Sequence, residues 1–115
     1  MKKIFTIVLI SLIAISLFAG GSQEKAPLKI GVPDDATNQA RAIKLLETAG
    51  LITVDPSVGY SPEIKHVTSY IYNIEIVPTT ANTLVSTLDD FGASTINGTY
   101  ATAAGYVPSR DAILL

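Results

Sequence analysis

The sequence contains no cysteine and only one histidine, and its 8 basic residues are outnumbered by 10 acidic ones. The absence of cysteine excludes disulfide bonds and thiolate chemistry, so an ordinary apolar core must stabilise the fold. The single histidine, His66, has no nearby cysteine, which leaves a metal site or a serine–histidine triad without its parts. Because phosphate binding needs clustered lysine and arginine, we expect no nucleic-acid partner.

The carboxylate and glycine patterns also point away from an enzyme. Asp34-Asp35 and Asp89-Asp90 are adjacent acids, which point apart and commonly mark helix starts or solvated loops. The glycines form neither a phosphate-binding loop nor a dinucleotide-binding pattern. We therefore expect no enzymatic activity, no metal and no cofactor.

The only long apolar run lies at the N-terminus. Lys2 and Lys3 precede residues 4–18, which are apolar apart from three hydroxyl residues, and small residues follow. This pattern is typical of an export signal, and the run is shorter than the roughly 20 residues of a membrane-spanning helix. We expect residues 1–21 to be a signal peptide, with an uncleaved anchor as the alternative, and residues 22–27 to be a flexible tether. The product should reach the periplasm or cell envelope.

The remainder is large enough for one domain only. Without the signal the chain keeps 6 basic and 10 acidic residues, a formal charge of about −4. A domain of roughly 90 residues buries a smaller fraction of its surface than a larger one. We expect this domain to cover residues 28–115.

The start of the domain predicts a strand, a loop and a helix. Residues 28–32 are an apolar run, and residues 37–49 follow with a helical pattern that Gly50 ends. Apolar positions at i, i+3, i+4 and i+7 predict the buried face of the helix. These positions are Ala42, Leu45, Leu46 and Ala49.

The next segments alternate between loop, strand and helix. Residues 51–69 carry Asp-Pro and Ser-Pro breaks, which predict a loop with one helical turn after Pro62. Residues 70–77 alternate β-branched and polar positions, which predicts a strand ending near Pro78.

The last part of the chain predicts one more strand between two helical segments. The short helices are expected over residues 83–90 and 99–105, and the strand over residues 93–97. Such alternation favours an α/β fold with about three mainly parallel strands and flanking helices.

Asn38 and Arg41 are the first candidate binding residues. They lie three residues apart in the first turns of the predicted helix, so both side chains project from one face near its positive end. Arginine holds both oxygens of a carboxylate with its planar fork. The alternative is that Asn38 or Thr37 only caps the helix and Arg41 is solvated.

Asn97 is the third candidate, because it ends a predicted strand and precedes Gly98. In a parallel sheet this end lies beside Asn38 and Arg41, at the edge where open α/β sheets bind small ligands. An amide donates to a carboxylate and accepts from an ammonium group, so Asn97 suits a zwitterion. The alternative is that Asn97 and Gly98 form a turn and nothing more.

Two stretches resemble a known family. VPDDATNQARAIKLLETAGLI, residues 32–52, and INGTYATAAG, residues 96–105, are similar to the signature regions of the methionine-binding NlpA-type lipoproteins of bacterial ABC importers. The resemblance implies one small lobe of a periplasmic-binding-protein-like (type II) fold. It also implies that Asn38, Arg41 and Asn97 grip the polar end of methionine or a similar amino acid, and that the partners are an ABC permease and ATPase.

The chain departs from that family in ways that bear on its activity. Family members are more than twice as long and have a preceding lobe, and Gly21 stands where they carry the lipid-bearing cysteine. We therefore expect no lipid anchor, and a truncated binding protein with little affinity for methionine. One alternative is an exported interaction module that self-associates through an exposed inter-lobe face. Another is a non-functional remnant.

Overall fold

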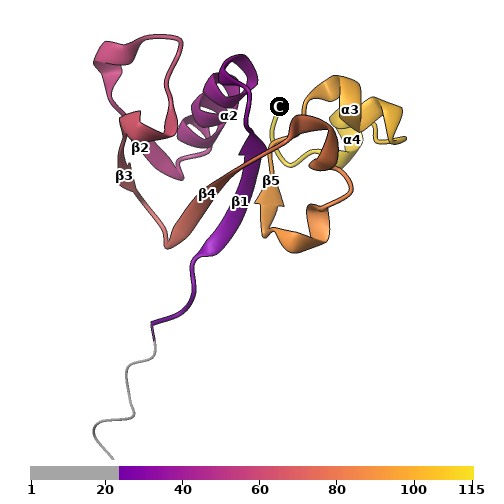
Figure 1. Ribbon diagram of the computed structural model, residues 1–115, viewed down its shortest axis with the longest axis horizontal. Helices are drawn as coiled ribbons and strands as arrows, with labels where there is room; N and C mark the ends of the chain where they lie inside the picture. Colours follow the sequence, from indigo (N-terminus) through magenta and orange to yellow (C-terminus); the bar gives the residue numbers. More distant parts are fainter. Residues whose placement is uncertain (1–23) are drawn as a thin grey trace, which may run out of the picture.

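The structure is a computed structural model that describes residues 24–115, so the expected signal peptide lies outside the described residues. The strands are β1 (Leu28–Pro33), β2 (Ile52–Val54), β3 (Val67–Tyr70), β4 (Ile74–Thr79) and β5 (Ala93–Ser94). The helices are α2 (Ala36–Thr48), α3 (Gly98–Ala103) and α4 (Pro108–Asp111), and short 3-10 helices are η1 (Pro56–Val58), η2 (Ile64–His66), η3 (Ala81–Thr83) and η4 (Leu88–Asp90). Figure 1 shows their arrangement.

β1 is the middle strand of a three-stranded parallel sheet with the order β4-β1-β5. It pairs with β4 along its full length, from Leu28 opposite Ile74 onward, but with β5 over two residues only. The predicted parallel sheet with flanking helices is therefore confirmed. β4 ends at Thr79, one residue past Pro78, as predicted, and the proline is tolerated because β4 is an edge strand. The predicted start at residue 70 is wrong, because residue 70 ends β3 and residues 71–73 form a bend. Parallel pairing places the carboxyl ends of the three strands at one edge of the sheet.

The core lies between this sheet, α2 and β2. Its buried members are Ile30, Val32, Ala42, Ile43, Leu46, Ile52, Val54 and Ile76. The prediction for α2 holds for Ala42 and Leu46. It is wrong for Leu45, which is half-buried, and for Ala49, which is exposed. Because α2 contacts both β1 and β2, its buried face is rotated toward Ile43, which has no exposed surface.

The end of α2 follows the prediction. Gly50 has a φ of 76°, the left-handed conformation that commonly stops a helix. Its N–H donates to the carbonyl oxygen of Glu47 at 3.0 Å, and the N–H of Leu51 donates to that of Leu46 at 3.1 Å. These bonds satisfy carbonyl groups that the helix end would otherwise leave without partners.

The predicted loop over residues 51–69 is wrong at both ends, because β2 and β3 form an antiparallel pair there. Ile52 lies opposite Tyr70 and Thr53 opposite Ser69, with a register irregularity after Thr53. The Asp-Pro and Ser-Pro breaks that predicted a loop fall in the connection between the two strands, which contains η1 and η2. Strands of three and four residues are too short to show a periodic pattern.

The predicted helix over residues 83–90 is also wrong, since this segment contains turns and η4 in place of an α-helix. The hydroxyl groups of Thr83, Ser86 and Thr87 donate to backbone carbonyl oxygens, an arrangement that competes with helical hydrogen bonding. The helix predicted over residues 99–105 is confirmed as α3. The predicted strand over residues 93–97 covers only residues 93–94, as β5.

The core geometry predicts a large loss of stability when Ile43 is shortened. Ile43→Ala removes a fully buried side chain between the sheet and α2, and we expect it to lower the free energy of unfolding by about 2–5 kcal/mol. Urea denaturation followed by circular dichroism measures the change. Ile113→Ala is the matched control, because Ile113 is 100% exposed. Equal effects of the two substitutions would contradict this core.

Candidate functional site

The three predicted binding residues line one cavity. It has a volume of about 620 Å³ and lies between the start of α2 and the segment after β5. Asn38 and Arg41 line it from α2, and Asn97 lines it from the end of the segment that follows β5. Figure 1 shows these segments side by side near the carboxyl end of β1. The structure thus brings together residues that are 56 and more positions apart in the sequence.

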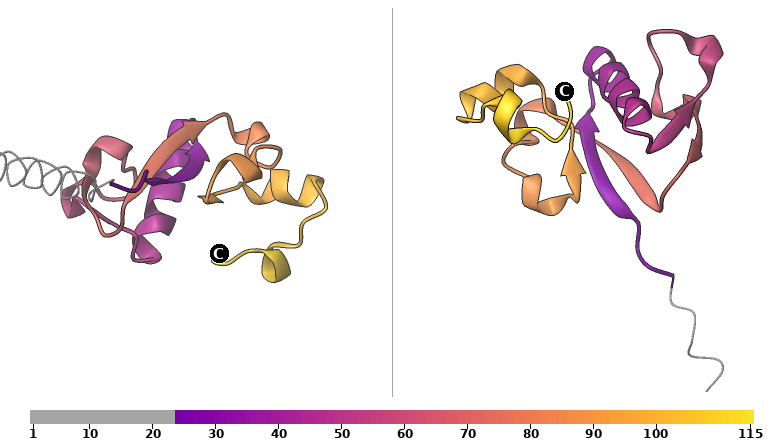
Figure 2. Two further views of the ribbon diagram at one scale, coloured as in Figure 1. Left: turned by 90° about the horizontal axis from the view of Figure 1, so that it is seen from below. Right: turned by 180° about the vertical axis from the view of Figure 1, so that it is seen from behind.

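Apolar side chains form much of the remaining cavity wall, to which Thr95 and Thr99 also contribute. Pro33, Leu45 and Ile96 line it together with Leu114 and Leu115 from the C-terminal segment. This segment returns toward the start of α2, as the right view of Figure 2 shows. The cavity therefore has a polar edge and an apolar wall, a combination that suits a small molecule with a charged end and an apolar side chain.

Asp35 is the residue that caps α2. Its Oδ1 accepts from the backbone N–H of Asn38 at 3.0 Å and from the Asn38 side-chain nitrogen at 2.9 Å. The alternative in which Asn38 or Thr37 caps the helix is therefore wrong. Because its nitrogen donates to Asp35, the Asn38 side chain is oriented and offers its oxygen as an acceptor.

Arg41 lies one turn further along α2 and is exposed. Among the described residues it makes no hydrogen bond or ion pair. Its guanidinium group keeps its donors for other partners, and a carboxylate is the partner that this planar fork fits best.

Asn97 occupies the N-cap position of α3 but forms no capping hydrogen bond with its side chain. Gly98, the first residue of α3, does not have a positive φ, so its backbone does not require glycine. A Cβ atom at Gly98 would also meet no described atom within 4 Å. The space beside Gly98 is open and belongs to the cavity, which leaves the Asn97 amide accessible from that side.

An apolar groove adjoins the cavity. It has a volume of about 520 Å³ and lies between α2, the C-terminal segment and α3. Leu46, Leu51, Ala101 and Ile113 are among its lining residues. Leu45 lines both the cavity and the groove, which explains why it is less buried than predicted.

Two buried hydroxyl groups lie next to the cavity without a partner among residues 24–115. The Oγ of Ser94 and the Oγ1 of Thr95 have almost no accessible surface and no hydrogen bond to any described residue. A Cβ atom at Gly31 of β1 would lie only 2.9 Å from the Ser94 oxygen, so Ser94 faces the neighbouring strand. Buried polar atoms of this kind cost stability, and the sequence pattern gave no signal for them.

His66 has a structural contact in η2. It is half-buried, and its Nδ1 accepts from the backbone N–H of Glu63 at 2.9 Å. The side-chain hydrogen bond from Lys65 lowers the pKa of the Glu63 carboxyl group. Within residues 24–115 no group of three potential metal ligands is found.

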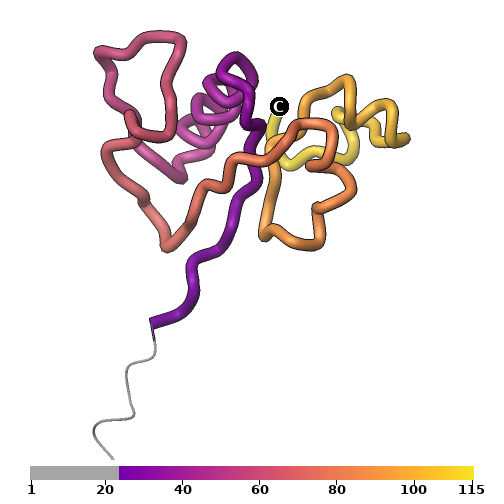
Figure 3. The backbone as a smooth tube through the Cα atoms, viewed as in Figure 1, coloured from indigo at the N-terminus to yellow at the C-terminus, as the bar shows by residue number. Residues whose placement is uncertain are grey.

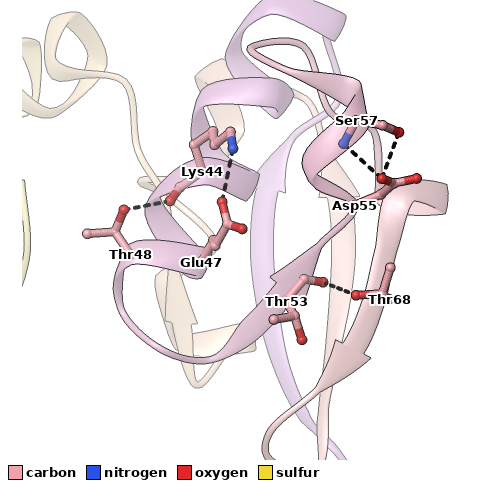
Figure 4. Close-up of polar contacts among 7 residues, drawn as sticks. All are labelled: Lys44, Glu47, Thr48, Thr53, Asp55, Ser57 and Thr68. Carbon is pink, nitrogen blue, oxygen red and sulfur yellow. Dashed lines mark hydrogen bonds and ion pairs between the residues drawn. The ribbon is translucent and has the colours of Figure 1, made fainter.

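Two further carboxyl groups are fixed by local partners outside the cavity. Hydrogen bonds from the hydroxyl and the N–H of Ser57 hold the pKa of Asp55 below its ordinary value, at 2.7 and 2.9 Å (Figure 4). The guanidinium of Arg110, 2.8 Å away, likewise lowers the pKa of Asp111. These bonds stabilise turns, and they do not form a catalytic arrangement.

Comparison with protein families matches residues 23–115 to the family described as NlpA lipoprotein. The D-methionine-binding lipoprotein MetQ of Escherichia coli K12 is 36% identical over 89 residues, which are 76% of this chain and 33% of that protein. The chain thus spans about a third of the length of this relative.

Two solved structures match this chain with similar sequence identity and over a similar share of its length. A nutrient binding protein from Burkholderia cenocepacia, solved bound to methionine, is 32% identical with a TM-score of 0.72, over 77% of this chain and 39% of that chain. The lipoprotein Tp32 of Treponema pallidum is 31% identical with a TM-score of 0.73, over 79% and 38%. The fold of this chain therefore matches part of these binding-protein structures.

The buried hydroxyl groups predict a stabilising substitution. Thr95→Val keeps the side-chain shape and removes an unpaired oxygen, so we expect the free energy of unfolding to rise by about 1 kcal/mol. Urea denaturation measures it. Thr53→Val is the control, because the exposed Thr53 hydroxyl is hydrogen bonded to Ser69 and its removal should bring no gain. A loss of stability in Thr95→Val would show that this oxygen has a partner.

Proposed function

The chain belongs to the NlpA lipoprotein family, and from that premise we propose that it is part of a substrate-binding component of an ABC importer for methionine or a similar amino acid. The observation that carries the proposal is the convergence of Asn38, Arg41 and Asn97 on one cavity. The similarity to a D-methionine-binding lipoprotein and to a nutrient binding protein solved with methionine supports the choice of ligand.

Each polar residue has a definite task in this proposal. Arg41 grips the ligand carboxylate with its guanidinium group, which has no described partner of its own. Asn97 donates its amide hydrogen atoms to the same carboxylate. The oxygen of Asn38, oriented by Asp35, accepts from the ligand ammonium group, and the apolar wall beside Leu45 receives the ligand side chain.

The affinity should be low, because the site is open to water. Ligand pockets usually bury most of their ligand, whereas the Arg41 side chain at this cavity is exposed. We therefore expect a dissociation constant of about 1 mM, equivalent to about −4 kcal/mol. An ABC permease and ATPase are the proposed partners of a functional product.

The proposal includes export. Residues 1–21 act as the signal peptide, residues 22–27 as the tether and residues 28–115 as the binding lobe. The similar proteins carry the word lipoprotein in their names, while this chain has no cysteine to carry a lipid. Within the described part of the chain no helix is both long and apolar enough to cross a bilayer.

A second candidate function is an interaction module, which the apolar groove favours. Exposed apolar surfaces of this kind commonly mark protein contacts. In this alternative two copies associate through the groove and the cavity binds no ligand.

Binding of methionine tests the first candidate. We expect millimolar L- or D-methionine to shift the NMR signals of Asn38, Arg41 and Asn97, and Arg41→Gln to weaken binding about tenfold through loss of charge-assisted hydrogen bonds. Arg110→Gln is the matched control, since Arg110 is exposed and lies outside the cavity. The ligand assignment fails if methionine shifts no cavity residue or if Arg41→Gln binds as well as the parent. Micromolar or tighter binding of methionine by a monomer would contradict the proposed low affinity of this open site.

Size-exclusion chromatography with light scattering tests the interaction module. If two copies associate through the groove, Ala101→Arg should shift the protein toward monomer, because it places a charge among apolar lining residues. Ala103→Arg on the exposed side of α3 should leave the association unchanged. A parent protein that is monomeric at all concentrations excludes this alternative.

A further inference from the structure

Exposed apolar side chains gather at the edge of the sheet opposite the cavity. Tyr70, Ile71 and Tyr72 lie at the end of β3 and in the turn before β4, and Leu28 begins β1. Because β1 and β4 are parallel, the starts of both strands lie at one edge, at the bottom of Figure 3. Leu28 is 54% exposed, Ile71 55% and Tyr72 62%. We call these four residues the amino-end patch.

The chain enters the described part of the structure beside this patch. The N–H of Leu28 donates to the carbonyl oxygen of Asn73 at 3.0 Å. The side-chain nitrogen of Asn73 donates to the carbonyl oxygen of Lys25 at 2.8 Å. These bonds hold the residues before β1 against the turn that carries most of the patch.

The sequence before this point contains the apolar run of residues 4–18. Even when fully extended, the nine residues 19–27 between the run and β1 span only about 30 Å. The inference rests on the alternative in which the apolar run is not cleaved. A membrane that holds the run then keeps the patch within reach, and a contact tethered in this way needs little affinity of its own.

We propose that the amino-end patch rests on a lipid bilayer, with the cavity at the opposite edge facing away from it. Tyrosine suits the boundary between lipid and water because its ring is apolar and its hydroxyl group is polar. Isoleucine and leucine add apolar surface to the same contact. The patch is separate from the cavity, so this inference does not depend on the ligand.

Charge makes a small contribution to the contact. Lys25 and Lys29 would attract anionic headgroups, but Glu24 lies next to Lys25 in the chain and Glu75 lies opposite Lys29 in the sheet. These charges balance, so the contact rests on the aromatic and aliphatic side chains and should change little with ionic strength.

The absence of cysteine makes this surface accessible to site-directed labelling. Full-length chains with Ile71→Cys or Tyr60→Cys, each carrying one nitroxide label, are bound to vesicles of equal parts phosphatidylcholine and phosphatidylglycerol. Tyr60 is 96% exposed and lies in the loop after η1. We expect oxygen to reach the label at position 71 better than a water-soluble nickel complex does, and the reverse at position 60. Equal, water-like accessibility at both positions overturns the proposal.

Paired tyrosine substitutions test whether the patch itself makes the contact. Tyr70→Ser with Tyr72→Ser should move the label at position 71 into water. Tyr100→Ser with Tyr106→Ser removes two comparably exposed tyrosines outside the patch and should leave the label in lipid. Circular dichroism verifies that both variants fold. A label that stays in lipid after loss of the patch tyrosines, or leaves it in both variants, contradicts the proposal.

Discussion

Parallel pairing of β1 with β4 and β5 is the constraint on which the structure depends. It aligns the carboxyl ends of the strands, so the segments that follow β1 and β5 begin at the same edge of the sheet. The start of α2 and the Asn97 segment meet there, although they are far apart in the chain. Antiparallel pairing of β5 would carry Asn97 to the other edge. Convergence of a guanidinium group and two amides therefore follows from strand direction.

Much of the fold could be predicted from sequence, because β1 and α2 carry strong local signals. A short, mostly apolar strand, a polar break and a helix ended by Gly50 all appear in the structure, and Asn38, Arg41 and Asn97 line one cavity, as the parallel sheet favours. Family membership also bears out the prediction that the chain is not an enzyme. The binding role of the three residues stays a proposal.

The parts that sequence did not predict depend on tertiary contacts or on competing hydrogen bonds. β2 and β3 are too short to show a pattern, and they form because Ile52 and Val54 join the core under α2. The helix expected around Leu84 is replaced by turns in which nearby hydroxyl groups bond to the backbone. Sequence indicated a helix start at Asp34-Asp35, and Asp35 is the N-cap of α2. It also allowed Asn38 or Thr37 as the cap, because all these residue types can cap a helix and only geometry distinguishes them.

The central claim is that Arg41 and Asn97 face one cavity, and spin–spin coupling between them tests it most directly. Nitroxide labels in the double variant Arg41→Cys with Asn97→Cys should show strong dipolar broadening in frozen solution, since both positions line the same space. A spectrum equal to the sum of the two single-label spectra would place the residues far apart. That result would contradict the account of the site.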